Sequence, residues 1–133
     1  MKPIRILLVD DHSVVRSGLG QMLGLEEDFK VAGEASNSEE TLKMIDIVSP
    51  DIILMDIKMP GMDGVRLTKE IKERFPSCNI IMFTLHGDYL NQAIEAGATG
   101  YLLKDIKRTD LTRAIRKVYS GQTVISENIQ SET

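Results

Sequence analysis

The chain lacks most of the residues that mark disulfide-stabilised, zinc-stabilised or membrane-embedded proteins. Its 133 residues include one cysteine, four prolines and no tryptophan, and aromatic residues make up only 5%. A single cysteine, Cys78, cannot form an internal disulfide, and no second cysteine supplies a zinc-type ligand set. No apolar run approaches the roughly 20 residues that cross a bilayer, and Met1–Pro3 carries no secretory signal. We therefore predict a cytoplasmic protein without a membrane segment.

Positive charge is also in short supply. The 20 acidic and 16 basic residues give a net charge of -4, the opposite of the basic surface of most nucleic-acid binders. This stretch is therefore not expected to bind nucleic acid directly.

The length of the chain matches one domain with a core large enough for stability without disulfides. That domain is expected over residues 1–121, and the polar residues 122–133 are expected to form a linker.

Short apolar runs alternate with segments of helical period, which is the pattern of a parallel sheet with crossover helices. Four of the five runs are apolar nearly throughout, as in strands covered on both faces. The exception, Val31–Ala35, contains Gly33 and Glu34 and is expected at a sheet edge. The sequence thus predicts an α/β fold with a doubly wound, five-stranded parallel sheet of order 2-1-3-4-5. The expected strands are Ile4–Val9, Val31–Ala35, Ile52–Met55, Ile80–Phe83 and Tyr101–Leu103.

The segments that follow these strands carry apolar residues at the i, i+3, i+4 spacing of amphipathic helices, whose apolar faces should pack on the sheet. Proline or glycine follows four of them as a stop signal, at Pro50, Pro76, Gly97 and Gly121. The fourth helix is expected to be short and thinly anchored, which makes it a candidate mobile element. The apolar stripes are Val15, Leu19, Met22 and Leu23; Leu42, Ile45 and Val48; Leu67, Ile71 and Phe75; Leu90, Ala93 and Ile94; and Leu111, Ile115 and Val118.

Five polar side chains lie at the carboxyl ends of the expected strands. Asp10 and Asp11 follow the first strand, Asp56 the third, Thr84 the fourth and Lys104 the fifth. In a doubly wound sheet these ends converge, and ligands bind where the strand order reverses, here between the first and third strands. The three carboxylates are therefore expected in one crevice.

Three carboxylates in one crevice repel each other and require a compensating cation. Mg²⁺ fits, because it prefers oxygen ligands and is typically held by one or two carboxylates plus a phosphate oxygen. Lys104 and the Thr84 hydroxyl could then stabilise the oxygens of a phosphoryl group during its transfer to Asp56, the expected nucleophile.

Each of these residues also has an ordinary structural interpretation. Alone, Asp11 is more simply a helix cap, Asp56 a turn carboxylate, Thr84 a strand residue and Lys104 a solvated surface charge. His12 is similarly interpreted as an exposed residue in the first turn of a helix. The functional interpretation is favoured because the structural one needs four coincidences at the same end of four different strands.

Four stretches of the sequence carry a family resemblance. They are LLVDDH at Leu7–His12, LMDIKMPGMDG at Leu54–Gly64, MFT at Met82–Thr84 and GYLLKD at Gly100–Asp105. Together they resemble the response-regulator receiver family of two-component signalling, over essentially the whole chain to about Gly121. The segments DDHSVVRSGL, VAGEASN and AIRKVYSGQTVIS also resemble its NarL/FixJ subgroup.

The resemblance implies a flavodoxin-like (βα)5 receiver domain with a role for each matching residue. Phosphorylation should draw the switch hydroxyl toward the phosphoacceptor and vacate space into which the rotating aromatic residue turns. The implied roles are Asp10, Asp11, Asp56 and the backbone carbonyl of Lys58 as Mg²⁺ ligands, Asp56 as phosphoacceptor, Thr84 as switch hydroxyl, Tyr101 as rotating aromatic residue and Lys104 as the family's lysine.

The resemblance also implies partners. A sensor histidine kinase would supply the phosphoryl group, the phosphorylated form would form a homodimer, and the linker would lead to a DNA-binding output domain absent from this sequence. Enzymatic activity would be limited to self-phosphorylation from small donors and autodephosphorylation. Two alternatives stay open: a phosphorylation-independent interaction domain, and a Mg²⁺-dependent phosphatase of the haloacid dehalogenase type. The latter places its nucleophile in a DxD motif after the first strand, where this chain has Asp10, Asp11 and His12.

Overall fold

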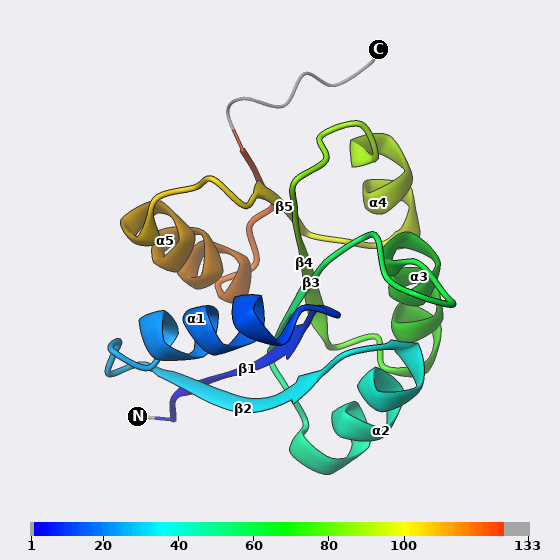
Figure 1. The fold of residues 1–133 in the computed structure, drawn as a ribbon. Coiled ribbons are helices and arrows are strands. Elements are labelled where there is room, and N and C mark those ends of the chain that lie inside the picture. The colour runs from blue at the N-terminus through cyan, green and yellow to red at the C-terminus, as the bar shows by residue number, and fades with distance from the viewer. Residues whose placement is uncertain (1, 127–133) are drawn as a thin grey trace.

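The computed structural model describes residues 2–126, which form one parallel sheet flanked by five helices (Figure 1). The strand order is β2-β1-β3-β4-β5-β6, and every neighbouring pair is parallel. The order expected for the first five strands is therefore confirmed. The strands are β1 (Ile4–Val9), β2 (Phe29–Ala35), β3 (Ile52–Met55), β4 (Asn79–Thr84), β5 (Gly100–Leu103) and β6 (Val124–Ile125).

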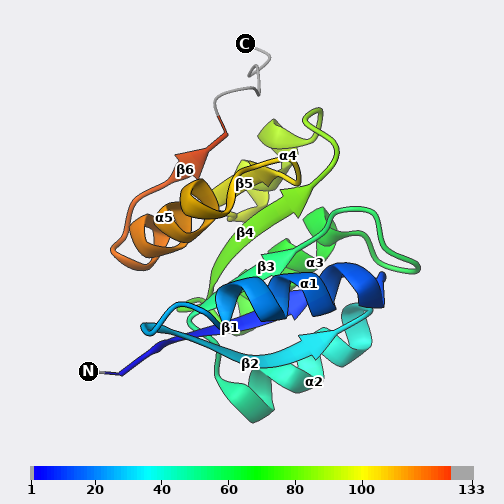
Figure 2. The same cartoon turned by 60° about the vertical axis from the view of Figure 1, so that its left-hand side comes forward.

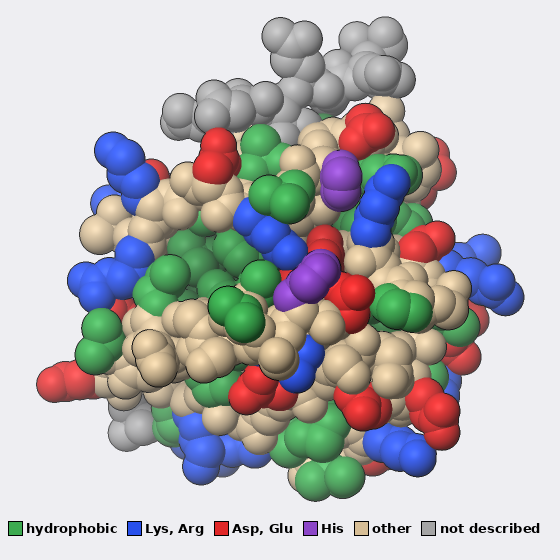
Figure 3. Space-filling model, viewed as in Figure 1, with side chains coloured by type: hydrophobic (Ala, Val, Ile, Leu, Met, Phe, Trp, Pro, Cys, Tyr) green, Lys and Arg blue, Asp and Glu red, His purple; other side chains and the backbone are tan. Residues whose placement is uncertain are grey.

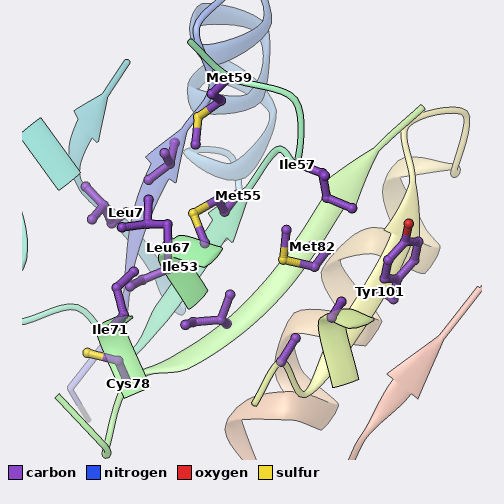
Figure 4. Close-up of a cluster of buried hydrophobic side chains, with 14 of the residues drawn as sticks. Leu7, Ile53, Met55, Ile57, Met59, Leu67, Ile71, Cys78, Met82 and Tyr101 are labelled. Carbon is purple, nitrogen blue, oxygen red and sulfur yellow. The ribbon is translucent and has the colours of Figure 1, made fainter. Parts of the chain in front are cut away.

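The helices divide between the two faces of the sheet, as Figure 2 shows. Helices α1 and α5 cover one face, where they pack on alternate strand residues such as Ile6 and Leu8. Helices α2, α3 and α4 cover the other face, on which Leu7 and Val9 lie (Figure 4). The bounds are α1 (Ser13–Leu23), α2 (Ser38–Val48), α3 (Gly64–Arg74), α4 (Leu90–Ala96) and α5 (Arg108–Tyr119). No helix within residues 2–126 has the length and apolar character that a membrane span requires.

Two features differ from the expected pattern. Ile94 was expected in the apolar stripe of α4, but it is 37% exposed, because this seven-residue helix packs mainly through Leu90 and Ala93. The sheet also gains a short sixth strand within the expected linker. The Val124 amide donates to the Thr99 carbonyl, and the amide of Ser126 donates to Tyr101, so this segment pairs with the edge of β5. The rest of the expected linker, 127–133, lies outside the described residues.

Candidate phosphoacceptor site

Lys104 joins two carboxylates that come from different strands. The pairing of Val9 with Met55 sets Asp10 beside Asp56, and Lys104 follows β5 at the same end of the sheet. Its Nζ donates to Asp10 Oδ2 at 2.7 Å and to Asp56 Oδ2 at 3.1 Å. The two aspartates are only 3% and 6% exposed. Figure 3 shows the acidic side chains gathered on this face with both histidines.

The two carboxylates also set the charge state of Lys104. Burial alone would lower the pKa of its ammonium, but the hydrogen bond to Asp10 and the charges of Asp56 and Asp10 outweigh burial and raise that pKa. The ammonium therefore stays charged and offsets part of the repulsion between the carboxylates.

Asp11 brings a third carboxylate to this site. Among the described residues, its buried Oδ1 atom accepts no hydrogen bond. The N-cap of α1 is His12, and no side chain caps this helix, so the interpretation of Asp11 as a helix cap is wrong. A buried carboxylate oxygen that accepts no hydrogen bond calls for a cation or an ordered water, and the nearest ionisable group is the His12 ring, with Nδ1 at 3.2 Å.

His12 contacts two of the aspartates, although the sequence predicted only an exposed helix residue. Its ring is 65% exposed, but Nδ1 lies 3.1 Å from Asp10 Oδ1 and 3.2 Å from Asp11 Oδ1. Its backbone amide also donates to Asp10 Oδ1 at 2.8 Å. The ligand atoms of these three residues and Asp56 all lie within 4.8 Å of one another. Nothing in the sequence around His12 distinguishes this position from an ordinary surface turn.

Asp56 is held by the turn that follows β3. The amide of Ile57 donates to Asp56 Oδ1 at 2.8 Å, which leaves Oδ2 to Lys104. Gly64, the first residue of α3, lies against this turn. A Cβ atom at Gly64 would lie 2.2 Å from the Asp56 carbonyl oxygen and 2.9 Å from Ile57 Cα. Sequence reasoning missed Gly64, although a glycine that opens a helix is a signal of close backbone approach.

Thr84 and Tyr101 both bind the backbone of His86, through the two peptide groups on either side of its Cα. The His86 amide donates to Thr84 Oγ1 at 3.2 Å, and the Tyr101 hydroxyl donates to the His86 carbonyl. The Tyr101 ring is already fully buried, so this structure does not contain the outward ring that the rotation model requires as its starting point. Burial raises the pKa of the Tyr101 hydroxyl to about 12. Thr84 is fully buried as well, at the end of β4.

The Lys58 side chain lies against Tyr89. Its Nζ atom is 5.6 Å from the centroid of the Tyr89 ring, which is a cation–π distance. Lys58 and Tyr89 both line a groove of about 980 Å³ that is bordered by Asp11 and by residues of α3 and α4. The metal-ligand role of the Lys58 carbonyl stays a prediction. No cis peptide occurs in the described part of the chain, so the bond between Lys104 and Asp105 is trans.

Comparison with known proteins identifies this arrangement. Residues 6–116 match the family model of the response regulator receiver domain. The chain belongs to this receiver domain family. It is 38% identical to the nitrate/nitrite response regulator protein NarL of Escherichia coli over 128 residues, which are 95% of this chain and 59% of NarL. The receiver thus spans less than two thirds of this relative, and the match places it in the NarL/FixJ-like subgroup.

Solved structures support the same conclusion. A two-component response regulator of the LuxR family from an Aurantimonas species matches with a TM-score of 0.91 at 32% identity, over 96% of this receiver and 93% of that chain. The isolated REC domain of RcsB from Salmonella enterica, in the presence of the phosphomimetic BeF3-, matches with a TM-score of 0.87 at 28% identity, over 96% of each chain. Response regulators of this subgroup are phosphorylation-controlled transcription regulators.

The family also decides between the alternatives from the sequence. Receivers are not a family of catalytic enzymes, which sets aside the phosphatase alternative. Receiver domains bind Mg²⁺ at an acidic pocket, and the residues present here fit that ion. All three aspartates offer carboxylate oxygens, which Mg²⁺ prefers, and the Oδ1 atom of Asp11 accepts no hydrogen bond that the ion would have to replace.

Proposed function

We propose that this receiver is a signalling switch that accepts a phosphoryl group on Asp56. One observation carries the proposal: the Lys104 ammonium binds both Asp10 and Asp56, while Asp11 beside them keeps a carboxylate oxygen that accepts no hydrogen bond. This arrangement provides a nucleophile, a fixed cation and free ligands for a divalent ion. Asp10, Asp11, Asp56 and the Lys58 carbonyl would hold Mg²⁺, which when bound neutralises charge on the phosphoryl oxygens.

The reaction follows from the positions of these groups. An Asp56 carboxylate oxygen attacks the phosphorus of a phosphohistidine on a sensor histidine kinase. The P–N bond of the donor breaks, and the released imidazole takes up a proton. The transferred phosphoryl group adds negative charge to the site. The Lys104 ammonium then moves its hydrogen bond from Asp56 to a phosphoryl oxygen. Such charge-assisted bonds stabilise the transferred group most when their donors are fixed in advance. Small donors such as acetyl phosphate would serve by the same route.

We propose that the conformational change is transmitted through the backbone of His86. If the Thr84 hydroxyl turns to donate to a phosphoryl oxygen, it gives up the hydrogen bond that it accepts from the His86 amide. The carbonyl of His86, in the next peptide group, accepts the hydrogen bond of the Tyr101 hydroxyl. A change at Asp56 is thereby passed to the segment between β4 and α4. Because the ring of Tyr101 is already buried, we propose that this segment and α4 move around it.

The output would be a change of assembly. We propose that phosphorylation favours a homodimer and thereby controls an attached DNA-binding output domain, as in full-length relatives. The sensor kinase, the receiver and the output domain would then interact in the cytoplasm. To move a two-state equilibrium from 1:99 to 99:1 requires about 5.5 kcal/mol of differential interaction. New charge-assisted hydrogen bonds from Thr84 and Lys104, together with the metal contacts, are of that order.

The direct test is the uptake of phosphate from acetyl phosphate in the presence of Mg²⁺, followed by intact mass. Wild type should gain one acid-labile phosphoryl group, whereas Asp56→Asn and wild type in EDTA should gain none. Equal uptake by Asp56→Asn would refute the assignment of Asp56. No uptake by the wild type would favour a phosphorylation-independent interaction domain.

The switch has a separate test with beryllofluoride, a phosphoryl mimic. We expect it to change the sedimentation behaviour and the amide signals of Thr84, His86 and Tyr101. If it binds, as judged by the amide signal of Ile57, and leaves all of these unchanged, the switch model is wrong.

A further inference from the structure

Arg16, on the first turns of α1, binds the backbone of a metal-binding aspartate. Its Nη1 donates to the Asp10 carbonyl oxygen, and its Nε donates to Glu34 Oε1 at 3.0 Å. The Arg16 side chain is 16% exposed and that of Glu34 49%. Asp10 follows β1 directly and Glu34 lies in β2, so one guanidinium joins the start of α1, the end of β1 and the edge strand β2.

The backbone of Asp10 is therefore fixed on both sides. Its amide donates to the Ala35 carbonyl of β2 at 3.1 Å, and its carbonyl reaches β2 through Arg16 and Glu34. The next residue along the chain is Asp11, whose Oδ1 atom is buried and accepts no hydrogen bond. A buried oxygen that binds a cation must be held in place before the cation arrives. No side chain caps the N-terminus of α1, so the turn that carries Asp11 does not provide this support itself.

We propose that Arg16 is the positioning residue of the metal pair Asp10 and Asp11, with Glu34 as its anchor. This inference rests on the proposed Mg²⁺ site and deepens it. The fixed fork of a guanidinium can bind two acceptors at once, which an ammonium cannot do with the same geometry. Groups that orient metal ligands typically contribute about 10-fold to 100-fold to metal affinity. Arg16 acts on a backbone carbonyl, so we expect the lower end of that range.

Loss of the Arg16 charge and loss of its positioning contacts should change the Mg²⁺ affinity in opposite directions, and the two effects can be separated. Removal of the Arg16 cation alone leaves more negative charge beside the pocket, which favours Mg²⁺, while the loss of positioning disfavours it. Glu34 neutralises Arg16 in the native protein, so Arg16→Gln combined with Glu34→Gln removes the contacts without a change of net charge. Any loss of Mg²⁺ affinity in that double variant comes from position.

A second arginine provides the matched control. Arg116 on α5 binds Asp28 and Glu26, and its guanidinium lies 4.7 Å from the centroid of the Phe29 ring. Phe29 is the first residue of β2, so this cluster lies at the amino ends of the strands, away from the acidic pocket. Arg116→Gln with Asp28→Asn also removes one cation and one anion.

The experiment is a Mg²⁺ titration of the whole chain without phosphodonor, followed by calorimetry and by the amide signals of Asp10 and Asp11. We expect the Arg16→Gln, Glu34→Gln variant to bind Mg²⁺ about 10-fold more weakly than wild type, and the Arg116 control to bind within about twofold. Arg16→Lys keeps the net charge but loses the guanidinium fork and should weaken binding too, which covers the case of a double variant that does not fold.

The outcomes are distinguishable. Wild-type affinity in both the double variant and Arg16→Lys would overturn the positioning role while leaving the metal site intact. An equal loss in the Arg116 control would overturn it as well, because the effect would then be a general consequence of lost stability. Absence of Mg²⁺ binding in wild type would overturn the proposed metal site and this inference together.

Discussion

Gly64 offers a sharp test of how tightly the phosphoacceptor turn is packed. In Gly64→Ala, the new Cβ atom would lie 2.2 Å from the Asp56 carbonyl oxygen, 2.9 Å from Ile57 Cα and 2.9 Å from Met82 Cε. The methionine methyl group can move at low cost. The other two atoms belong to the backbone of the turn that carries Asp56, and they can give way only if that turn shifts relative to α3.

The size of the effect follows from these contacts. Overpacking of a well-packed interior costs about 1–3 kcal/mol, and more where backbone must move. Alanine is a better helix former than glycine by about 1 kcal/mol, which offsets only part of this cost at the first residue of a helix. We therefore expect Gly64→Ala to lower the free energy of unfolding by about 2 kcal/mol. We also expect slower phosphorylation of the folded fraction.

Gly18→Ala is the matched control, because Gly18 lies inside α1 and nothing is within 4 Å of the position of its Cβ. There the helix propensity acts alone, and stability should rise by about 0.5–1 kcal/mol. Urea unfolding of wild type and both variants measures the two changes, provided that the denaturant dependence stays the same. A Gly64→Ala protein as stable as Gly18→Ala would refute the tight packing of the turn.

Three further predictions concern the site. Mg²⁺ at 100 times its Kd should raise the free energy of unfolding by about 2.7 kcal/mol, and an Asp10→Asn, Asp11→Asn variant that gained as much would contradict the proposed ligands. The raised pKa of Tyr101, about 12, means that folding favours the neutral phenol. Its contribution, at most about 2–3 kcal/mol, is present below pH 10 and lost as the pH rises through 12. In urea unfolding across that range Tyr101→Phe should lose less stability than wild type, and identical pH profiles would count against this. Lys58→Asn and His86→Glu should shorten the phosphoryl lifetime after donor removal, because neither native side chain is an evident base for the attacking water; equal decay rates would leave both as plain surface residues.

Much of the fold could be predicted because it depends on patterns that extend along the chain. Apolar runs such as Ile52–Met55 alternate with helical stripes, and this alternation defines both the sheet and its strand order. The convergence of Asp10, Asp56 and Lys104 follows from that topology alone, since the carboxyl ends of neighbouring parallel strands lie together. The structure adds the two hydrogen bonds of Lys104, which no pattern specifies.

The remaining features depend on contacts between distant residues. β6 has only two residues, too few for a periodic pattern in the sequence to predict it. It is defined by its pairing with β5. The bond from Arg16 to Glu34 joins residues 18 positions apart, and each looks like a surface charge in isolation. The full burial of Tyr101 likewise depends on packing against residues distant in the sequence.

The central claim is that Asp56, and neither acidic neighbour, carries the phosphoryl group. Borohydride reduces an aspartyl phosphate to homoserine, so it marks the modified residue permanently. After phosphorylation with Mg²⁺ and acetyl phosphate, reduction and peptide mapping should place homoserine at position 56. Homoserine at Asp10 or Asp11, or its absence from a protein that has gained phosphate by intact mass, would contradict the account.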